Sequence, residues 1–120
     1  MVRKTLILGA SENPKRYSNI AIKRLKSIGV EVKAIGRRRG IVEDILIETN
    51  LIKFEDIHTV TLYLSAKNQP EFYNYIIGLQ PKRVLFNPGT ENPYFEQLLT
   101  KNNINFERAC TLVLISLDAY

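Results

Sequence analysis

Five short runs of apolar and β-branched residues recur along the chain, and a stretch with helical spacing follows most of them. Such runs, bounded by glycine, proline or polar residues, are typical of buried strands. In the first helical stretch, Ala21, Leu25 and Ile28 recur at three- and four-residue intervals, which is typical of a helix with one buried face. The predicted strands are residues 4–8, 30–35, 58–64, 83–86 and 104–106.

Capping residues predict where three helices begin. Ser18, Asn68 and Asn92 are the predicted N-caps, because short polar side chains accept hydrogen bonds from the first free N–H groups of a helix. A proline follows Asn92, as is favoured at the first helical position, and Gly29 suits the residue after the first helix. The type of secondary structure stays open for two segments. Residues 36–57 fit a short extra strand or an irregular excursion, and the apolar run 112–117 fits either type of element.

The alternation of strands and helices predicts a single α/β domain over residues 1–120. Repeated steps of this length imply a mainly parallel sheet of five strands with right-handed crossovers and helices on both faces. In open sheets of this kind, ligands bind beyond the carboxyl ends of the strands, where the strand order reverses. The loops to inspect are therefore residues 9–18, 36–40, 65–68 and 87–92.

Composition narrows the class of protein. The chain is 45% hydrophobic and 24% charged, which predicts a folded core rather than disorder. Apolar runs are far shorter than the roughly 20 residues that span a bilayer, and none resembles a signal peptide, so we expect a soluble cytoplasmic protein without membrane contact. One cysteine and one histidine cannot form a disulfide or a structural zinc site. The net charge of +5 is concentrated in the N-terminal half, which favours an acidic partner, either nucleic acid or a phosphate-bearing small molecule.

The loop after the first strand is the first predicted site. A strand, a small-residue turn and a helix start together direct backbone N–H groups and the positive end of a helix dipole at one point, an arrangement that favours phosphate. The loop lacks the later glycines of G-x-G-x-x-G, and an ordinary strand–helix connection is the alternative interpretation. The predicted phosphate-binding loop comprises Gly9, Ala10, Ser11, Lys15, Arg16, Tyr17 and Ser18.

The turn after the second strand carries three arginines between two glycines. NAD-binding folds usually place an acidic residue there for the ribose hydroxyls, whereas a guanidinium matches phosphate oxygens. Gly36, Arg37 and Arg38 therefore predict a site for a phosphorylated ribose, as found in NADP and coenzyme A. The alternative is a solvated basic loop.

Two further loops have polar residues at the predicted ligand edge. Asn87, Gly89 and Thr90 follow the fourth strand, and Ser65 and Gln69 follow the third. Turn and cap chemistry alone is the alternative interpretation for the first of these loops. No catalytic triad, carboxylate pair or metal cluster can be assembled. The single histidine is predicted at the opposite edge of the sheet, and the single cysteine is interpreted as a core residue.

Several of these motifs together resemble a known family. GASENPKRYS, GRRRG, DIHTVTLYL, PKRVLFNPGTENP and ERACTLVLISLDAY resemble the small, stand-alone, bacterial-type CoA-binding domain proteins, which look like the CoA-binding domain of the succinyl-CoA synthetase α subunit. The resemblance covers essentially the whole chain and implies a Rossmann-like three-layer α/β/α fold. By this resemblance, residues of the first loop surround the pyrophosphate of coenzyme A, the arginine turn meets the adenosine end, and Ser65 with residues 87–90 lies along the pantetheine. The turn departs from the Val-Asn-Pro-like sequence of many relatives.

The predicted function is binding of coenzyme A or an acyl-CoA without a catalytic centre, because the synthetase's active-site histidine and partner subunit have no counterpart here. The alternative is an NADP-dependent oxidoreductase or an NADP-binding regulatory protein. Nucleic-acid binding is a third class, for which the chain has no recognition motif. A homodimer or a protein partner is compatible with any of these.

Overall fold

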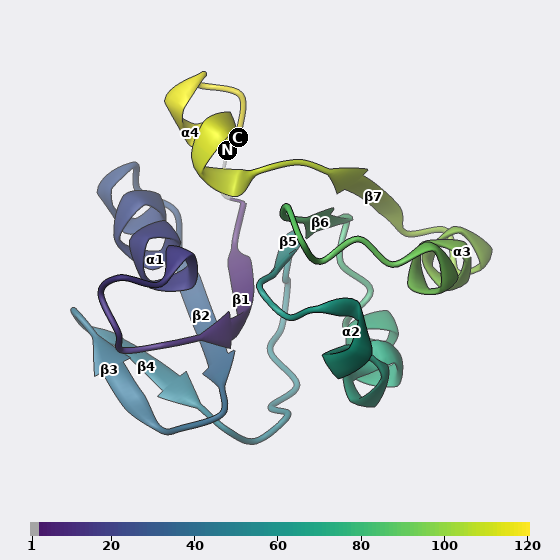
Figure 1. Ribbon diagram of the computed structural model, residues 1–120, viewed down its shortest axis with the longest axis horizontal. Helices are drawn as coiled ribbons and strands as arrows, with labels where there is room; N and C mark the ends of the chain where they lie inside the picture. Colours follow the sequence, from purple (N-terminus) through teal and green to yellow (C-terminus); the bar gives the residue numbers. More distant parts are fainter. Residues whose placement is uncertain (1–2) are drawn as a thin grey trace.

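A seven-stranded sheet forms the centre of the protein in a computed structural model that describes residues 3–120 (Figure 1). Its strand order is β3-β4-β2-β1-β5-β6-β7, and only the β3–β4 pair is antiparallel. The order reverses between β1 and β5, which places a topological switch point at the carboxyl end of β1. The strands are β1 (Thr5–Ala10), β2 (Val32–Gly36), β3 (Gly40–Val42), β4 (Ile45–Glu48), β5 (Thr59–Leu62), β6 (Arg83–Phe86) and β7 (Asn105–Arg108).

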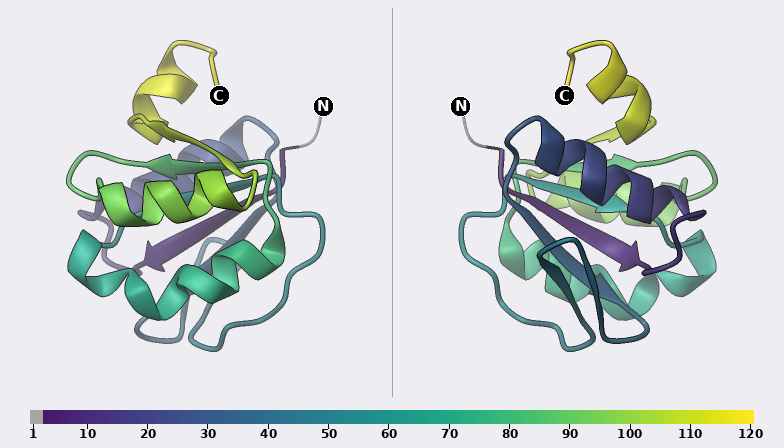
Figure 2. Two further views of the ribbon diagram at one scale, coloured as in Figure 1. Left: turned by 90° about the vertical axis from the view of Figure 1, so that its right-hand side faces the viewer. Right: turned by 90° about the vertical axis from the view of Figure 1, so that its left-hand side faces the viewer.

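Helices cover both faces of this sheet, so the predicted three-layer Rossmann-like fold is confirmed (Figure 2). Successive side chains of β1 point to opposite faces: Leu6 and Leu8 pack with α2 and α3, and Ile7 packs with α1 and α4. Both faces of β1 are buried, as expected for a central parallel strand. The helices are α1 (Tyr17–Ser27), α2 (Tyr73–Leu79), α3 (Pro93–Lys101) and α4 (Thr111–Ser116), with short 3-10 turns at Ala66–Asn68 and Pro70–Phe72.

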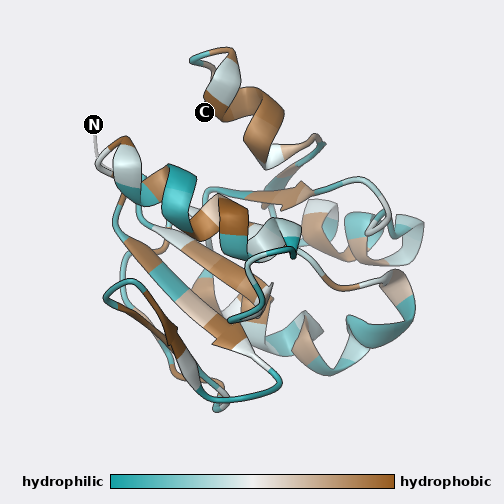
Figure 3. Ribbon diagram, turned by 60° about the vertical axis from the view of Figure 1, so that its left-hand side comes forward, coloured by the Kyte–Doolittle hydropathy of each residue, from teal (hydrophilic) through white to brown (hydrophobic). Residues whose placement is uncertain are grey.

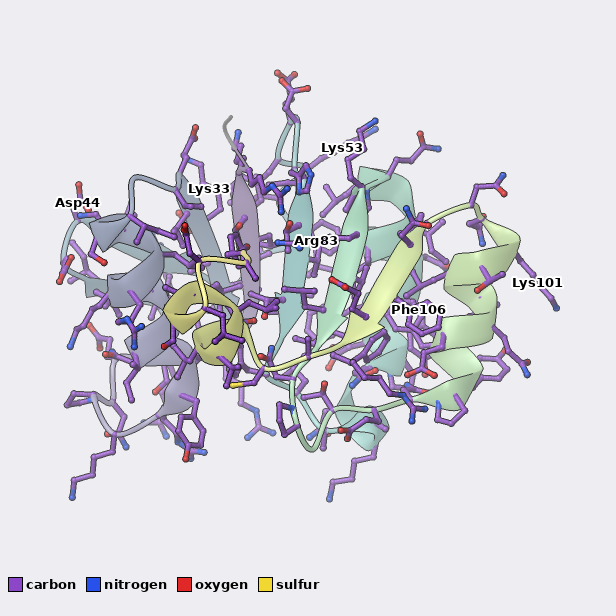
Figure 4. The ribbon with its side chains drawn as sticks, turned by 90° about the horizontal axis from the view of Figure 1, so that it is seen from above. Lys33, Asp44, Lys53, Arg83, Lys101 and Phe106 are labelled. Atoms are coloured by element: carbon purple, nitrogen blue, oxygen red, sulfur yellow. The ribbon has the colours of Figure 1, made fainter. Side chains whose placement is uncertain are left out.

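The prediction of five strands is wrong, because an antiparallel hairpin of β3 and β4 extends one edge of the sheet. Val42 and Ile47 of this hairpin are buried against α1. Glu43 adopts a positive φ of 55° in the two-residue turn, and Lys26 of α1 forms ion pairs with Glu43 and Asp44. Figure 4 shows Asp44 at the outer edge of the molecule, beside α1. β3 has three residues and β4 has four. Strands of this length are too short for their hydrophobic pattern to be recognised in the sequence.

The helix starts differ in part from the predictions. Asn92 is confirmed as an N-cap, since its Oδ1 accepts from the backbone N–H of Phe95 at 3.1 Å. Ser18 is not a cap, because α1 begins one residue earlier and the side chain of Ser18 is buried. Asn68 is not a cap either: it ends a 3-10 turn, and α2 begins only at Tyr73.

The open C-terminal segment forms α4, a short helix that is apolar around most of its circumference (Figure 3). Leu112 and Ile115 pack against the α1 side of the core, whereas Val113 and Leu117 are exposed. None of the helices in residues 3–120 combines the length and the apolar character needed to cross a membrane.

Two half-buried or buried tyrosines predict a loss of stability at alkaline pH. Burial raises the pKa of Tyr63 to about 12 and that of Tyr75 to about 12. Between pH 10 and pH 12 the unfolded chain releases these protons and the folded protein keeps them, so stability is full below pH 10 and falls as the pH rises toward 12. Between pH 9 and pH 11, we expect the free energy of unfolding of Tyr63→Phe to fall by about 1 kcal/mol less than that of the parent protein. Urea unfolding at the two pH values measures this difference. Equal losses would contradict the assignment.

Candidate functional site

The last part of β1 contains an irregularity, between Leu8 and Ala10, that only glycine permits. Gly9 has a φ of +93°, and a Cβ at this position would lie 2.9 Å from the carbonyl oxygen of Tyr63. Gly9 therefore lets the carboxyl ends of β1 and β5 approach each other closely. β1 ends at Ala10, at the switch point of the sheet, where the sequence analysis predicted the ligand.

Short-range hydrogen bonds order the loop between this turn and α1. The backbone N–H of Asn13 donates to Ser11 Oγ, and that of Lys15 donates to Asn13 Oδ1, both at 3.0 Å. Asn19 anchors the loop from α1, because its Nδ2 donates to the Ser11 carbonyl at 2.9 Å. The loop is thus pre-organised, and the Ser11 hydroxyl hydrogen still faces no recorded acceptor within residues 3–120.

The start of α1 has the features of an anion site, with one change from the prediction. The first N–H groups of a helix have no carbonyl partner within the helix and lie at the positive end of its dipole. Lys15, Arg16 and Tyr17 are exposed beside them, where they can meet a ligand. Ser18 is only 3% exposed, so it can contribute its backbone N–H and not its hydroxyl.

The arginine turn and the first loop start next to each other, at the paired ends of β2 and β1. Gly36 of β2 packs so closely on the Ala10 carbonyl that any side chain at position 36 would clash with this backbone. Arg39 is within 4.0 Å of Glu48, at the end of β4. Arg37 and Arg38 are exposed, and neither has an ion pair within the described part of the chain. The structure therefore brings the two most basic predicted segments together at one edge of the sheet.

Asn87 and its neighbours form an internal hydrogen-bond network. Asn87 Nδ2 donates to Thr61 Oγ1 at 2.6 Å and to the Leu62 carbonyl at 2.9 Å, and its Oδ1 accepts from the Thr111 N–H at 2.8 Å. This single buried amide ties β5 and β6 to the start of α4. Both Nδ2 hydrogens are therefore used within the protein, so the side chain of Asn87 has no donor left for a ligand.

Gln69 and Thr90 belong to the same internal network. Gln69 is fully buried, and its Nε2 donates to the carbonyls of Leu64 and Thr90, each at 2.8 Å. Thr90 Oγ1 donates to the Asn87 carbonyl at 2.7 Å. Ser65 and Gly89, in contrast, are exposed at the edge, and a Cβ at Gly89 would meet nothing within 4 Å. Of the predicted residues in these two loops, these two are the ones that face open space.

Residues with other chemistry lie away from this edge. His58 precedes β5 at the opposite end of the sheet, and burial lowers its pKa, helped by Arg83, Arg3 and Lys82. Figure 4 shows Arg83 there, on the strand next to β5. Cys110 is half-buried just before α4. Within residues 3–120, no three His, Cys, Asp or Glu side chains are grouped to bind a metal.

Two open grooves, of about 460 and 450 Å³, run between α3 and β7. They are lined by residues such as Thr100 and Phe106 and contain none of the predicted site residues. We give them no role in the site, because the basic and glycine-rich segments lie elsewhere.

The sequence analysis missed two residues of the first loop region, Glu12 and Asn19. Glu12 Oε2 accepts from the Ile41 N–H at 2.8 Å and so joins the loop to β3. Asn19 is 2% exposed, and its Oδ1 is buried without a hydrogen-bond partner within the described residues. A polar residue in the first turn of a buried helix was a visible signal for Asn19. No signal in the sequence pointed to Glu12, since its partner lies 29 residues away.

The domain is a Rossmann-like α/β domain, because its strand order reverses between β1 and β5 and a helix starts beyond the end of β1. The chain belongs to the CoA-binding domain family, whose sequence model matches residues 3–116.

Solved structures agree with this fold. An uncharacterized protein with 45% sequence identity superposes with a TM-score of 0.97 over 100% of this chain and 99% of its own. A protein from Thermus thermophilus (18% identity, TM-score 0.85) aligns over 98% of this chain and 91% of its own. A hypothetical protein from Pyrococcus horikoshii OT3 (23% identity, TM-score 0.84) aligns over 92% of this chain and 80% of its own. These two share the fold alone. A search of curated proteins finds no match.

Proposed function

We propose that the protein binds coenzyme A or an acyl-CoA at the carboxyl edge of β1, β2 and β5, and that it has no catalytic centre of its own. Membership of the CoA-binding domain family supports the ligand class. The observation that carries the assignment is the contact of Gly36, the last residue of β2, with the carbonyl of Ala10, the last residue of β1, because the arginine turn and the first loop start directly after these two residues. One polyphosphate ligand can therefore meet both segments.

In this proposal the pyrophosphate binds at the start of α1. The free N–H groups there and the Ser11 hydroxyl donate hydrogen bonds, and Lys15 and Arg16 neutralise charge. Loop hydrogen bonds already hold Ser11 in place, so little conformational entropy is lost on binding.

Arg37 and Arg38 take the 3′-phosphate of the ribose. Neither guanidinium is committed to an ion pair within residues 3–120, so both are free to bind an anion. A charge pair at about 4 Å is worth of order 4 kcal/mol at an effective dielectric near 20, before desolvation is subtracted. This is enough to separate a phosphorylated from an unphosphorylated ribose.

The pantetheine arm runs past the carboxyl end of β5 toward the loop after β6. Ser65 and Gly89 line this path with exposed polar and backbone groups, while Gln69, Asn87 and Thr90 hold the loops in shape from inside. Two of these five residues thus contact the ligand, and the other three stabilise the loops.

Calorimetric titration with coenzyme A, dephospho-CoA, NADPH and NADH tests the proposal. We expect coenzyme A to bind at least about tenfold more tightly than dephospho-CoA and than either nicotinamide nucleotide. Preference for NADPH would favour the oxidoreductase alternative. Equal affinity for coenzyme A and dephospho-CoA would contradict the role of the arginines. A mass spectrum of the purified protein under native conditions identifies any free or acylated ligand that it retains.

A further inference from the structure

Glu12 connects two segments that the proposed site needs at a defined separation. It lies in the loop that leads to α1, and its carboxylate accepts the Ile41 N–H at 2.8 Å. A hydrogen bond to a charged acceptor is stronger than one between neutral groups. Glu12 also lies against Gly40, where its carboxyl group fills the space that a Cβ would occupy.

The arginine turn is consequently held at one end by β1 and at the other by the loop that follows β1. At its start, Gly36 packs on the Ala10 carbonyl, and just after its end, Ile41 donates to Glu12. Only residues 37–40 lie between these contacts. The backbone of Arg37 and Arg38 cannot move away from the loop unless one of the two contacts breaks.

A carboxylate is an unfavourable neighbour for a polyanionic ligand, because like charges repel. Glu12 has no ion pair with Arg37, Arg38 or Arg39 within the described residues, so charge neutralisation of the turn does not account for its position. Its recorded hydrogen bond is to the backbone of β3. The geometry is that of a tether between two backbone segments.

We propose that Glu12 is a positioning residue that fixes the arginine turn relative to the start of α1 and thereby sets the preference for a phosphorylated over an unphosphorylated ribose. This inference rests on the proposed coenzyme A site. It assigns to Glu12 no contact with the ligand.

The affinities of three variants for coenzyme A and dephospho-CoA test the inference. Glu12→Ala removes the acceptor, and we expect about fivefold weaker binding of coenzyme A with little change for dephospho-CoA. Glu12→Gln keeps an acceptor oxygen, and we expect it to retain the parent preference. Glu55→Ala is the matched control, because it removes an exposed carboxylate that makes no recorded hydrogen bond or ion pair within residues 3–120. An unchanged preference in Glu12→Ala, or an equal loss for both ligands, overturns the inference.

A ligand-free measurement separates this inference from the proposed function. Hydrogen exchange of the Ile41 amide is expected to be about tenfold faster in Glu12→Ala than in the parent protein and close to parental in Glu12→Gln. Unchanged exchange in Glu12→Ala overturns the tether whether or not coenzyme A binds. If the parent protein does not bind coenzyme A, the proposed function fails, and if it binds coenzyme A and dephospho-CoA equally, the proposed role of the arginines fails; in both cases the exchange result still reports on Glu12.

Discussion

Replacing both Arg37 and Arg38 with serine is expected to weaken coenzyme A binding by about 100-fold and dephospho-CoA binding by less than about threefold. The two guanidiniums are exposed and have no ion pair within the described residues, so their loss removes ligand contacts without disturbing the fold. Hydrogen bonds to charged groups contribute about 1.5–3 kcal/mol each, and two of them at the lower end of this range correspond to about 100-fold in affinity. Calorimetric titration at one fixed ionic strength measures both affinities.

Arg39→Ser is the matched control. Its guanidinium is already within 4.0 Å of Glu48, so we expect it to change coenzyme A affinity by less than about threefold. If the double variant loses affinity for both ligands equally, the arginines supply only general attraction. If Arg39→Ser has the larger effect, the phosphate lies at the β4 end of the turn.

Replacing Asn87 with leucine is expected to lower the free energy of unfolding by about 3 kcal/mol. The side chain is 4% exposed and makes three hydrogen bonds, to Thr61, Leu62 and Thr111. Leucine has a similar size but leaves a buried carbonyl and a buried N–H group without partners. Urea unfolding followed by circular dichroism measures the change.

Asn68→Ala is the matched control for this substitution. Asn68 is exposed, and its Nδ2 donates at 3.1 Å to Ser65 Oγ, so we expect a change below about 0.5 kcal/mol. If Asn87→Leu keeps full stability and loses coenzyme A binding, Asn87 contacts the ligand and the internal network is of minor importance.

These two predictions separate the residues at the carboxyl edge by their role. The arginines and the buried amides both lie in loops that follow parallel strands, and the sequence alone does not distinguish their roles. Burial distinguishes them: Arg37 and Arg38 face solvent, whereas Asn87 and Gln69 are closed off by hydrogen bonds to the protein itself. A polar residue at a ligand edge can therefore support the site without touching the ligand.

Most of the fold could be predicted because its signals are local. Residues 83–86 form β6 as predicted, and the Asn92-Pro93 pair begins α3 because cap chemistry depends on neighbours in the sequence. For residues 36–57 an extra strand and an irregular excursion were both left open, and the hairpin of β3 and β4 was not recognised, since its stability depends on Val42 and Ile47 packing against α1. α4 was left open for the same reason, because a short apolar run is compatible with a strand or a helix until its neighbours are known.

The sequence by itself determined the alternation of strands and helices, the glycine near the end of β1, the basic turn after β2 and, through its motifs, the family. These features depend on hydrophobic periodicity, backbone freedom and side-chain charge, which are properties of residues that are close together in the sequence. Only the tertiary structure decided that Gly36 packs on Ala10, that Glu12 holds Ile41, and that the Asn87 amide is already satisfied. Each of these contacts joins residues 24 to 29 positions apart in the sequence, and the packing of the strands brings them within hydrogen-bonding or van der Waals distance.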